Sequence, residues 1–274
     1  MINDTQKAFG AYALKGYQNR LLHRAQTVPA SWVGRRAALL LRKAVMLGNP
    51  PVVDTVVDGL KLRLYTLDNV SERKFLFMPQ FFDSYERGLL KERLKSGDIF
   101  VDVGANAGIY SLTAAALVGD AGKVIAIEPN PVVMERLTFN AALNGFSERI
   151  AAEPSGVSDA EGVFDLTLDD RNLGGSSLVA TRSSRKISVQ CHKLLSLMER
   201  HQISGIGALK IDIEGAEDKA LIPFFAEAPS SLCPKLLILE NSPGDWKADL
   251  PSALKNAGYR LMKVTRMNQV WELA

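Results

Sequence analysis

Residues 99–108, IFVDVGANAG, decide the fold, because here an apolar run carries an acid near its end and then enters a turn of small residues. The run Ile99–Val103 predicts a buried strand that contains Asp102. Between Gly104 and Gly108 almost no side chain projects from the backbone, so another group is expected to lie close to it. That group could be a dinucleotide, a phosphate, another cofactor or only a neighbouring helix.

Helices and strands are predicted to alternate on both sides of this stretch, from residue 85 onward. The further strands read KVIAIEP, RIAAEP, ALKIDIEG and KLLILEN, and helices among them stop at Gly97, Gly119 and Gly145. Such alternation is typical of a parallel sheet with helices on both faces. The predicted fold class is therefore α/β, a doubly wound and mostly parallel sheet, whose last segments YRLMKVT and NQVWEL form an antiparallel hairpin.

The region before this sheet, residues 1–84, is predicted to form a helical and β-hairpin cap over an 85–274 ligand-binding domain. Its first 48 residues carry eight cations against Asp4 alone, a net charge of +7, so the rest of the +3 chain is acidic at −4. This basic segment could contact an anionic membrane surface, although a solvated helical appendage is the simpler interpretation. The acidic body makes a broad nucleic-acid surface unlikely to be the main feature, and no nucleic-acid partner is expected.

Composition places the chain among ordinary globular proteins, with 47% hydrophobic and 23% charged residues over 274 positions. No apolar run reaches the roughly 18 residues of a membrane span, and the N-terminal residues do not resemble a signal peptide. The two cysteines have no spacing typical of a zinc site or a disulfide framework. We therefore expect a cytoplasmic protein, and no metal site is predicted.

Acids recur where the predicted strands end, at Asp102, Glu128, Asp212 and Glu240. In a parallel α/β sheet the ligand lies beyond the carboxyl ends of the strands. Four carboxylates at one edge would be costly to bury without a role, so they predict a binding or catalytic site there.

The turn after the first strand discriminates between ligands. Its pattern, Gly104-x-Asn106-x-Gly108, is not the G-x-G-x-x-G of dinucleotide sites, and no Gly-Lys-Ser/Thr of a phosphate-binding loop follows. Asp102 would repel a pyrophosphate but suits a cationic amino group, and Glu128 is placed to accept the two hydroxyls of a ribose. A ligand with a ribose, an ammonium group and no phosphate is expected, and S-adenosylmethionine fits that description.

Several of these motifs, in this order, resemble the FkbM-type family of S-adenosylmethionine-dependent methyltransferases: FVDVGANAGIYSLTAA, VIAIEPNP, GGSSL, LKIDIEGAE and LLILEN. The resemblance runs from about residue 85 to the end of the chain. It implies a class I methyltransferase fold, a Rossmann-like seven-stranded sheet of order 3-2-1-4-5-7-6, plus O-methylation of hydroxyls on sugars, polyketides or other secondary metabolites.

The resemblance also implies how the cofactor is held. The methionine end would lie at Asp102, Gly104, Asn106 and Gly108, the ribose at Glu128 with Pro129 and Asn130 beside it, and the adenine at Ser155 and Gly156.

The stretch KIDIEGAE at 210–217 supplies the catalytic candidates Asp212 and Glu214, and Glu240 joins them from the next strand. A carboxylate here could position the cofactor or take the proton of an incoming hydroxyl. Glu214 could equally be a helix-start carboxylate favoured by the dipole. In GGSSL, Ser176 and Ser177 could offer hydroxyls to a polar substrate, or the segment could be only a flexible loop.

Three other functions stay open at this point: a nicotinamide-dependent oxidoreductase on a similar sheet, a protein that keeps the fold as a non-catalytic binding partner, and a nucleic-acid methyltransferase. Asp102 and the missing third glycine disfavour the first. The expected partner is a small-molecule hydroxyl substrate, such as a sugar, a polyketide or a lipid-linked glycan.

Overall fold

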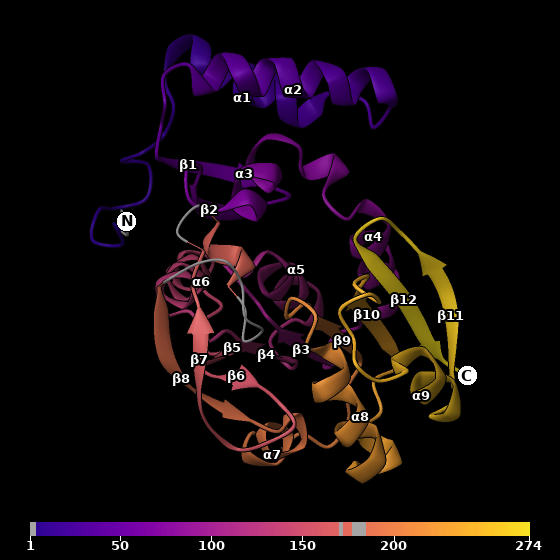
Figure 1. Cartoon of the computed structure of the whole chain (residues 1–274). Helices are drawn as coiled ribbons and strands as arrows, with labels where there is room; N and C mark the ends of the chain where they lie inside the picture. The colour runs from indigo at the N-terminus through magenta and orange to yellow at the C-terminus, as the bar shows by residue number, and fades with distance from the viewer. Residues whose placement is uncertain (1–3, 170–171, 177–184) are drawn as a thin grey trace.

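The structure, a computed structural model, describes residues 4–169, 172–176 and 185–274. Its α-helices are α1 (Gly16–Thr27), α2 (Trp32–Met46), α3 (Val70–Phe77), α4 (Ser84–Arg93), α5 (Ile109–Val118), α6 (Pro131–Leu143), α7 (Leu194–Arg200), α8 (Glu217–Glu227) and α9 (Leu250–Asn256). Its strands are β1 (Val52–Val57), β2 (Leu60–Tyr65), β3 (Ile99–Val103), β4 (Lys123–Ile127), β5 (Ile150–Glu153), β6 (Gly156–Val157), β7 (Gly162–Thr167), β8 (Lys186–His192), β9 (Ala208–Ile211), β10 (Leu236–Glu240), β11 (Tyr259–Val264) and β12 (Asn268–Leu273). Figure 1 shows these elements along the chain.

The main sheet has seven strands in the order β11-β12-β10-β9-β3-β4-β5. Strands β5, β4, β3, β9 and β10 pair in parallel, and β12 joins antiparallel between β10 and β11. Numbered by their order in the sheet-forming part of the chain, the strands run 3-2-1-4-5-7-6, which confirms the predicted fold class. The order reverses between β3 and β9, where ligands bind in such sheets.

Alternate residues of each strand face opposite layers of helices. In β3, Val101 and Val103 pack with α7, α8 and α9, whereas Phe100 packs with α4, α5 and α6. Asp102 shares the second face with Phe100, so its carboxylate points toward the α5 layer and is fully buried. The sheet therefore carries a charged residue inside its apolar core, one position from its carboxyl edge.

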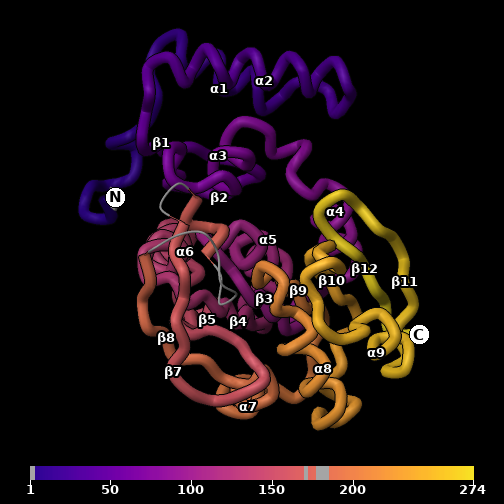
Figure 2. Tube along the Cα trace, in the orientation of Figure 1, coloured from indigo at the N-terminus to yellow at the C-terminus, as the bar shows by residue number. Residues whose placement is uncertain are grey.

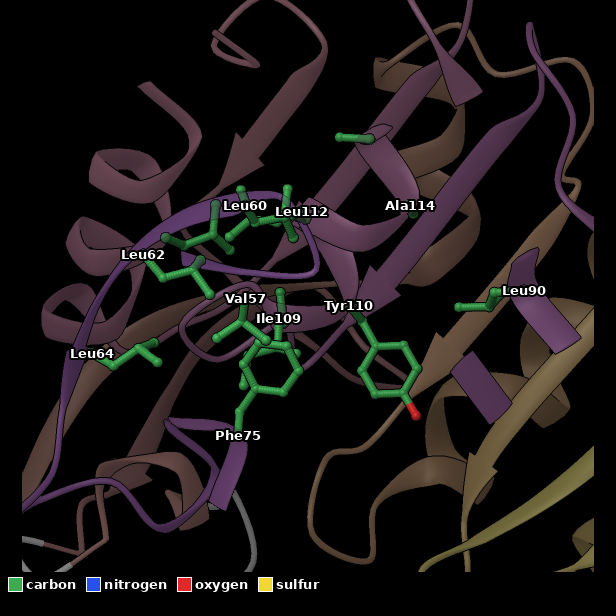
Figure 3. Close-up of a cluster of buried hydrophobic side chains, with 14 of the residues drawn as sticks. Val57, Leu60, Leu62, Leu64, Phe75, Leu90, Ile109, Tyr110, Leu112 and Ala114 are labelled. Atoms are coloured by element: carbon green, nitrogen blue, oxygen red, sulfur yellow. The ribbon is translucent and has the colours of Figure 1, made fainter. Parts of the chain in front are cut away.

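The N-terminal region stacks on the α5 and α6 side of the sheet (Figure 2). Its hairpin turns at Asp58 and Gly59, whose φ angles of 51° and 82° fit the two-residue turns that match strand twist. Side chains of β1, β2 and α3 pack against α5, as Leu62, Phe75 and Leu112 show (Figure 3). Residues 1–84 thus share one hydrophobic core with the sheet, and the domain boundary near residue 84 stays a prediction.

Some details differ from the sequence-based expectation. The helix expected to stop at Gly97 ends at Arg93, because Leu94 is already extended and the Asp98 carboxylate accepts the Lys95 N–H at 2.7 Å. Helix α3 was not predicted; the Asn69 side chain begins it by accepting the Glu72 N–H at 3.1 Å. Strands β6, β8 and β7 form a separate three-stranded sheet beside the main one.

Candidate active site

The loop after β3 lies against the protein's own backbone. Gly104 has a φ of +74°, and a Cβ built there would lie 1.9 Å from the backbone oxygen of Asp212. A Cβ on Gly108 would lie 2.6 Å from the side chain of Leu137 in α6. The backbone N–H groups of Gly104 and Ala105 both donate to the Ile127 carbonyl, at 2.9 and 3.0 Å. The glycines therefore allow the loop to pack onto the ends of β4 and β9 and onto α6.

Glu128, just beyond β4, ties this loop to the start of α6. Its carboxylate accepts the backbone N–H of Asn106 at 2.9 Å and that of Asn130 at 2.8 Å. The Asn130 side chain in turn caps α6 by accepting the Val132 N–H at 3.1 Å. Burial raises the pKa of Glu128 to about 7, although the two backbone N–H groups act to lower it. The predicted ribose acid is thus fixed at the carboxyl edge of the sheet, one strand away from the switch in strand order.

A cavity opens to solvent at this edge of the sheet. Six of the predicted site residues line it: Gly104, Glu128, Pro129, Ser155, Gly156 and Asp212. The remaining wall is formed by Val103, Ile127, Val157, Leu166, Leu173, Gly174, Ser176 and Ile213, so none of the described lining residues is a lysine or an arginine. The Glu128 and Asp212 carboxylates disfavour a pyrophosphate here and offer acceptors to a ribose and an amino group.

Three predicted site residues carry a buried oxygen that has no hydrogen-bond partner among the described residues. They are Asp102 at Oδ1, Ser155 at Oγ and Glu240 at Oε2. The other Asp102 oxygen accepts from the Ser111 hydroxyl at 2.5 Å. Buried polar atoms normally have a hydrogen-bond partner, so three unpartnered oxygens around one edge of the sheet indicate a site for a polar ligand. Carboxylates for an ammonium group and for hydroxyls, with one further hydroxyl, fit S-adenosylmethionine.

Sequence reasoning missed Lys210, which pairs with Asp102 across the β3–β9 ladder. Its ammonium group is buried and lies 3.1 Å from Oδ2 of Asp212. Burial raises the pKa of Asp102 and the Lys210 charge acts to lower it. The ammonium also lies 5.0 Å from the ring centre of Tyr110, whose hydroxyl donates to Asp83 at 3.0 Å. A lysine inside the apolar strand ALKI was the signal that could have identified it.

The three candidate acids differ in environment. Asp212 is paired with Lys210, and burial raises the pKa of Glu240 well above its usual range, with repulsion from Asp212 and Glu214 adding to the shift. Glu214 is exposed and adopts a left-handed φ of 55°. Loss of water around the carboxylate raises the pKa of Glu214 to about 7, and repulsion from the Asp212 carboxylate adds to the shift. Of Glu214 and Glu240, Glu214 therefore has the pKa nearer to neutral pH.

Glu217 shapes the turn that presents Glu214, and its role was not foreseen. One carboxylate oxygen accepts the backbone N–H groups of Ile213 at 2.8 Å and Gly215 at 3.3 Å. The other accepts from the indole N–H of Trp246 at 2.8 Å. This buried carboxylate holds the turn from two sides, which supports the left-handed conformation at Glu214.

The N-terminal region reaches the same edge. The side-chain amide of Asn69 donates to Oδ1 of Asn106 at 2.7 Å, and the Leu173 N–H donates to the Asp68 carbonyl at 2.7 Å. Leu173 lines the cavity, so residues 68–70 are one hydrogen bond from its wall. Ser176 of the GGSSL segment also lines the cavity, whereas Ser177 lies outside the described residues.

Within the described ranges, no group of three or more His, Cys, Asp or Glu residues is arranged to hold a metal ion. Nor does that part of the chain contain a helix long and apolar enough to cross a membrane.

The strand order and the acids at the carboxyl edge of the sheet fit a class I methyltransferase that uses S-adenosylmethionine. A model of the FkbM methyltransferase domain matches residues 102–261. The chain belongs to this family, and its resemblance to FkbM-type enzymes is confirmed.

The chain is also similar to individual methyltransferases. Methyltransferase sdnD of Sordaria araneosa is 26% identical over 61% of this chain and 74% of that protein. The 31-O-demethyl-FK506 methyltransferase FkbM of Streptomyces tacrolimicus is 28% identical over 56% of this chain and 69% of that protein. Among solved structures, an S-adenosylmethionine-dependent O-methyltransferase of Thermotoga maritima is 12% identical with a TM-score of 0.44, covering 84% of this chain and 80% of that one.

Proposed function

We propose that this methyltransferase acts on oxygen, on a hydroxyl of a sugar, a polyketide or another secondary metabolite. The names of two relatives support an acceptor of this kind: 31-O-demethyl-FK506 for one, and hexuronic acid for AglP of Haloferax volcanii, which is 29% identical over 48% of this chain and 52% of that protein. The family assignment favours methyl transfer over the nicotinamide-dependent oxidoreductase.

The observation that carries the proposal is Glu214, an exposed carboxylate that directly follows the cavity-lining residues Asp212 and Ile213 and has a pKa of about 7. A hydroxyl is a weak nucleophile until a base takes its proton, and a base with a pKa near the working pH is best suited to this. Asp212 is held in its ion pair with Lys210, and Glu240 keeps its proton at neutral pH. Glu214 is therefore proposed as the base, with Asp212 and Glu240 as positioning groups.

The residues around the cavity suggest how the cofactor is held. The unpartnered Asp102 oxygen would accept from the amino group, Glu128 from the ribose hydroxyls, and Ser155 beside Gly156 would contact the adenine. When bound, S-adenosylmethionine supplies an electrophilic methyl group for direct displacement by the acceptor oxygen. Asn106 and Asn130 keep Glu128 in place through their backbone N–H groups.

Replacing Glu214 by glutamine should lower kcat/KM about 100-fold, within the range usual for loss of a general base. The carboxylate is the active form, so kcat/KM of the natural protein should rise with pH up to about 7 and then level off. Purified protein, labelled S-adenosylmethionine and a panel of hydroxylated glycosides and uronic acids would provide the profile, with mass spectrometry locating the methyl group.

The exposed Glu148 offers a matched control, since Glu148→Gln removes a carboxylate away from the cavity and should leave the profile unchanged. Transfer to nitrogen, sulfur or a carboxylate, or an unchanged kcat/KM for the acceptor in Glu214→Gln at saturating S-adenosylmethionine, would contradict the proposal. Cofactor binding without transfer to any acceptor of the panel would favour the non-catalytic binding protein.

Replacing Ser155 by alanine should have opposite effects on two quantities. The free energy of unfolding of the ligand-free protein should rise by about 1 kcal/mol, because a buried hydroxyl without a partner is removed. Affinity for S-adenosylhomocysteine should fall about 5-fold to 10-fold if the hydroxyl binds the adenine. Urea unfolding and calorimetric titration measure the two effects, and equal cofactor affinity in both proteins would remove Ser155 from the site.

A further inference from the structure

The outer face of α2 combines large apolar side chains with cations. Trp32, Arg36, Leu40, Lys43 and Leu47 follow one another at spacings of three and four residues, which places them on one face of the helix and its extension. The apolar members are mostly exposed, at 71% for Trp32, 70% for Leu40 and 86% for Leu47. An apolar stripe of this size on a monomer surface usually marks an interaction site.

The opposite face of the same helix is already used. Ala38 and Val45 are fully buried in the core shared with the sheet, as are Leu22 and Ala25 of α1. The two helices therefore form a hairpin that is fixed to the body by one face and presents its other face outward. Figure 1 shows this hairpin at one end of the molecule, with α7, α8 and α9 at the other.

The charge of the hairpin is entirely positive. Residues 15–48 contain seven lysines and arginines and no aspartate or glutamate. Arg36 stacks over the Trp32 ring, with its guanidinium carbon 4.8 Å from the ring centre. The exposed apolar stripe is thus interleaved with cations, and no carboxylate of the hairpin competes for them.

We propose that this outer face docks on the surface of an anionic lipid bilayer. Trp32, Leu40 and Leu47 would enter the headgroup region, where tryptophan is favoured because its ring is amphipathic. Arg36 and Lys43 would lie against lipid phosphates, their aliphatic stems running along the same apolar surface. A nucleic acid would use the cations but would leave the three exposed apolar side chains in water. The docking goes beyond methyl transfer and does not depend on which acceptor is methylated.

The test is co-sedimentation of the full chain with vesicles of mixed phosphatidylcholine and phosphatidylglycerol, compared with phosphatidylcholine alone. The natural protein should bind the anionic vesicles and bind the neutral ones much more weakly. The double variant Arg36→Glu/Lys43→Glu should lose more than about 25-fold in vesicle affinity, since each cation near the surface contributes about fivefold and each new carboxylate adds repulsion. The double variant Trp32→Ser/Leu40→Ser should also lose binding and the vesicle-induced blue shift of tryptophan emission.

Matched changes elsewhere provide the controls. Val163→Ser/Leu261→Ser removes two exposed apolar side chains, and Lys235→Glu/Lys255→Glu reverses two exposed lysines, all of them outside the hairpin. Both control proteins should bind vesicles as the natural chain does, and every variant should keep its affinity for S-adenosylhomocysteine. Three results would overturn the proposal: no binding to anionic vesicles, equal loss in the controls, or self-association of the free protein through Trp32 and Leu40. Binding to an oligonucleotide duplex in place of vesicles would assign the face to nucleic acid instead.

Discussion

Replacing Gly104 by alanine is expected to abolish measurable binding of S-adenosylhomocysteine and to lower the free energy of unfolding by about 3 kcal/mol or more. The added Cβ would lie 1.9 Å from the backbone oxygen of Asp212, and backbone cannot give way as a flexible side chain can. The end of β9 and the loop after β3 would have to separate. Misplacing binding groups by about 1 Å can cost 100-fold in function.

The variant Gly145→Ala is the control that distinguishes the effect of this steric clash from the effect of backbone strain alone. Its φ of +70° is close to the +74° of Gly104, but a Cβ there meets nothing within 4 Å. Gly145→Ala should therefore cost only about 1 kcal/mol, the strain of a left-handed alanine, with unchanged cofactor affinity. Urea unfolding and calorimetric titration of both variants give the comparison. Normal cofactor binding by Gly104→Ala would show that the junction of the two strands does not form the site.

Much of this junction could be predicted from the sequence because its signals are local. Apolar runs that stop at an acid located β3, β4 and β10, and the Asp58-Gly59 pair located the N-terminal hairpin. Parallel strands bring their carboxyl ends to one edge, so Asp212 and Glu128 were expected near each other, and both line the cavity. Periodicity and strand topology were enough for this level of description.

The contacts that determine the charge state and the position of each acid could not be predicted in the same way. Lys210 influences Asp102 only because β9 lies beside β3, a pairing between residues far apart in sequence. The contact of Asn69 with Asn106 likewise depends on how the N-terminal region folds back over the loop. Local patterns do not specify the partner of a buried charge, so the three candidate acids could not be ranked from sequence alone.

Replacing Arg136 by methionine should lower the free energy of unfolding by about 3–5 kcal/mol, the cost of leaving buried charges uncompensated. The guanidinium is fully buried in α6 and donates to Glu72 at 2.8 Å and to Asp68 at 3.0 and 2.9 Å. Glu72 is completely buried and also accepts the Tyr65 N–H at 3.0 Å. Arg93, about half exposed in its pair with Glu272, provides the control, since Arg93→Met should cost less than about 1 kcal/mol.

The deficit of Arg136→Met should also depend on pH. Burial raises the pKa of Glu72 to about 7 even though Arg136 acts to lower it, so without Arg136 the folded-state pKa is higher still. Because the pKa of Glu72 is higher in the folded than in the unfolded protein, folding favours the protonated carboxyl. The contribution of Glu72 to the free energy of unfolding is therefore fully present below pH 4.5, the pKa of the unfolded state, and is lost as the pH rises through the pKa of the folded state. Urea unfolding should therefore show a larger deficit at about pH 8 than at about pH 5. Adding Glu72→Gln to Arg136→Met should recover part of the lost stability at the higher pH, because the neutral amide still accepts from the Tyr65 N–H. If the deficit depends neither on pH nor on Glu72→Gln, Arg136 stabilises the fold only by packing over the Tyr65 ring.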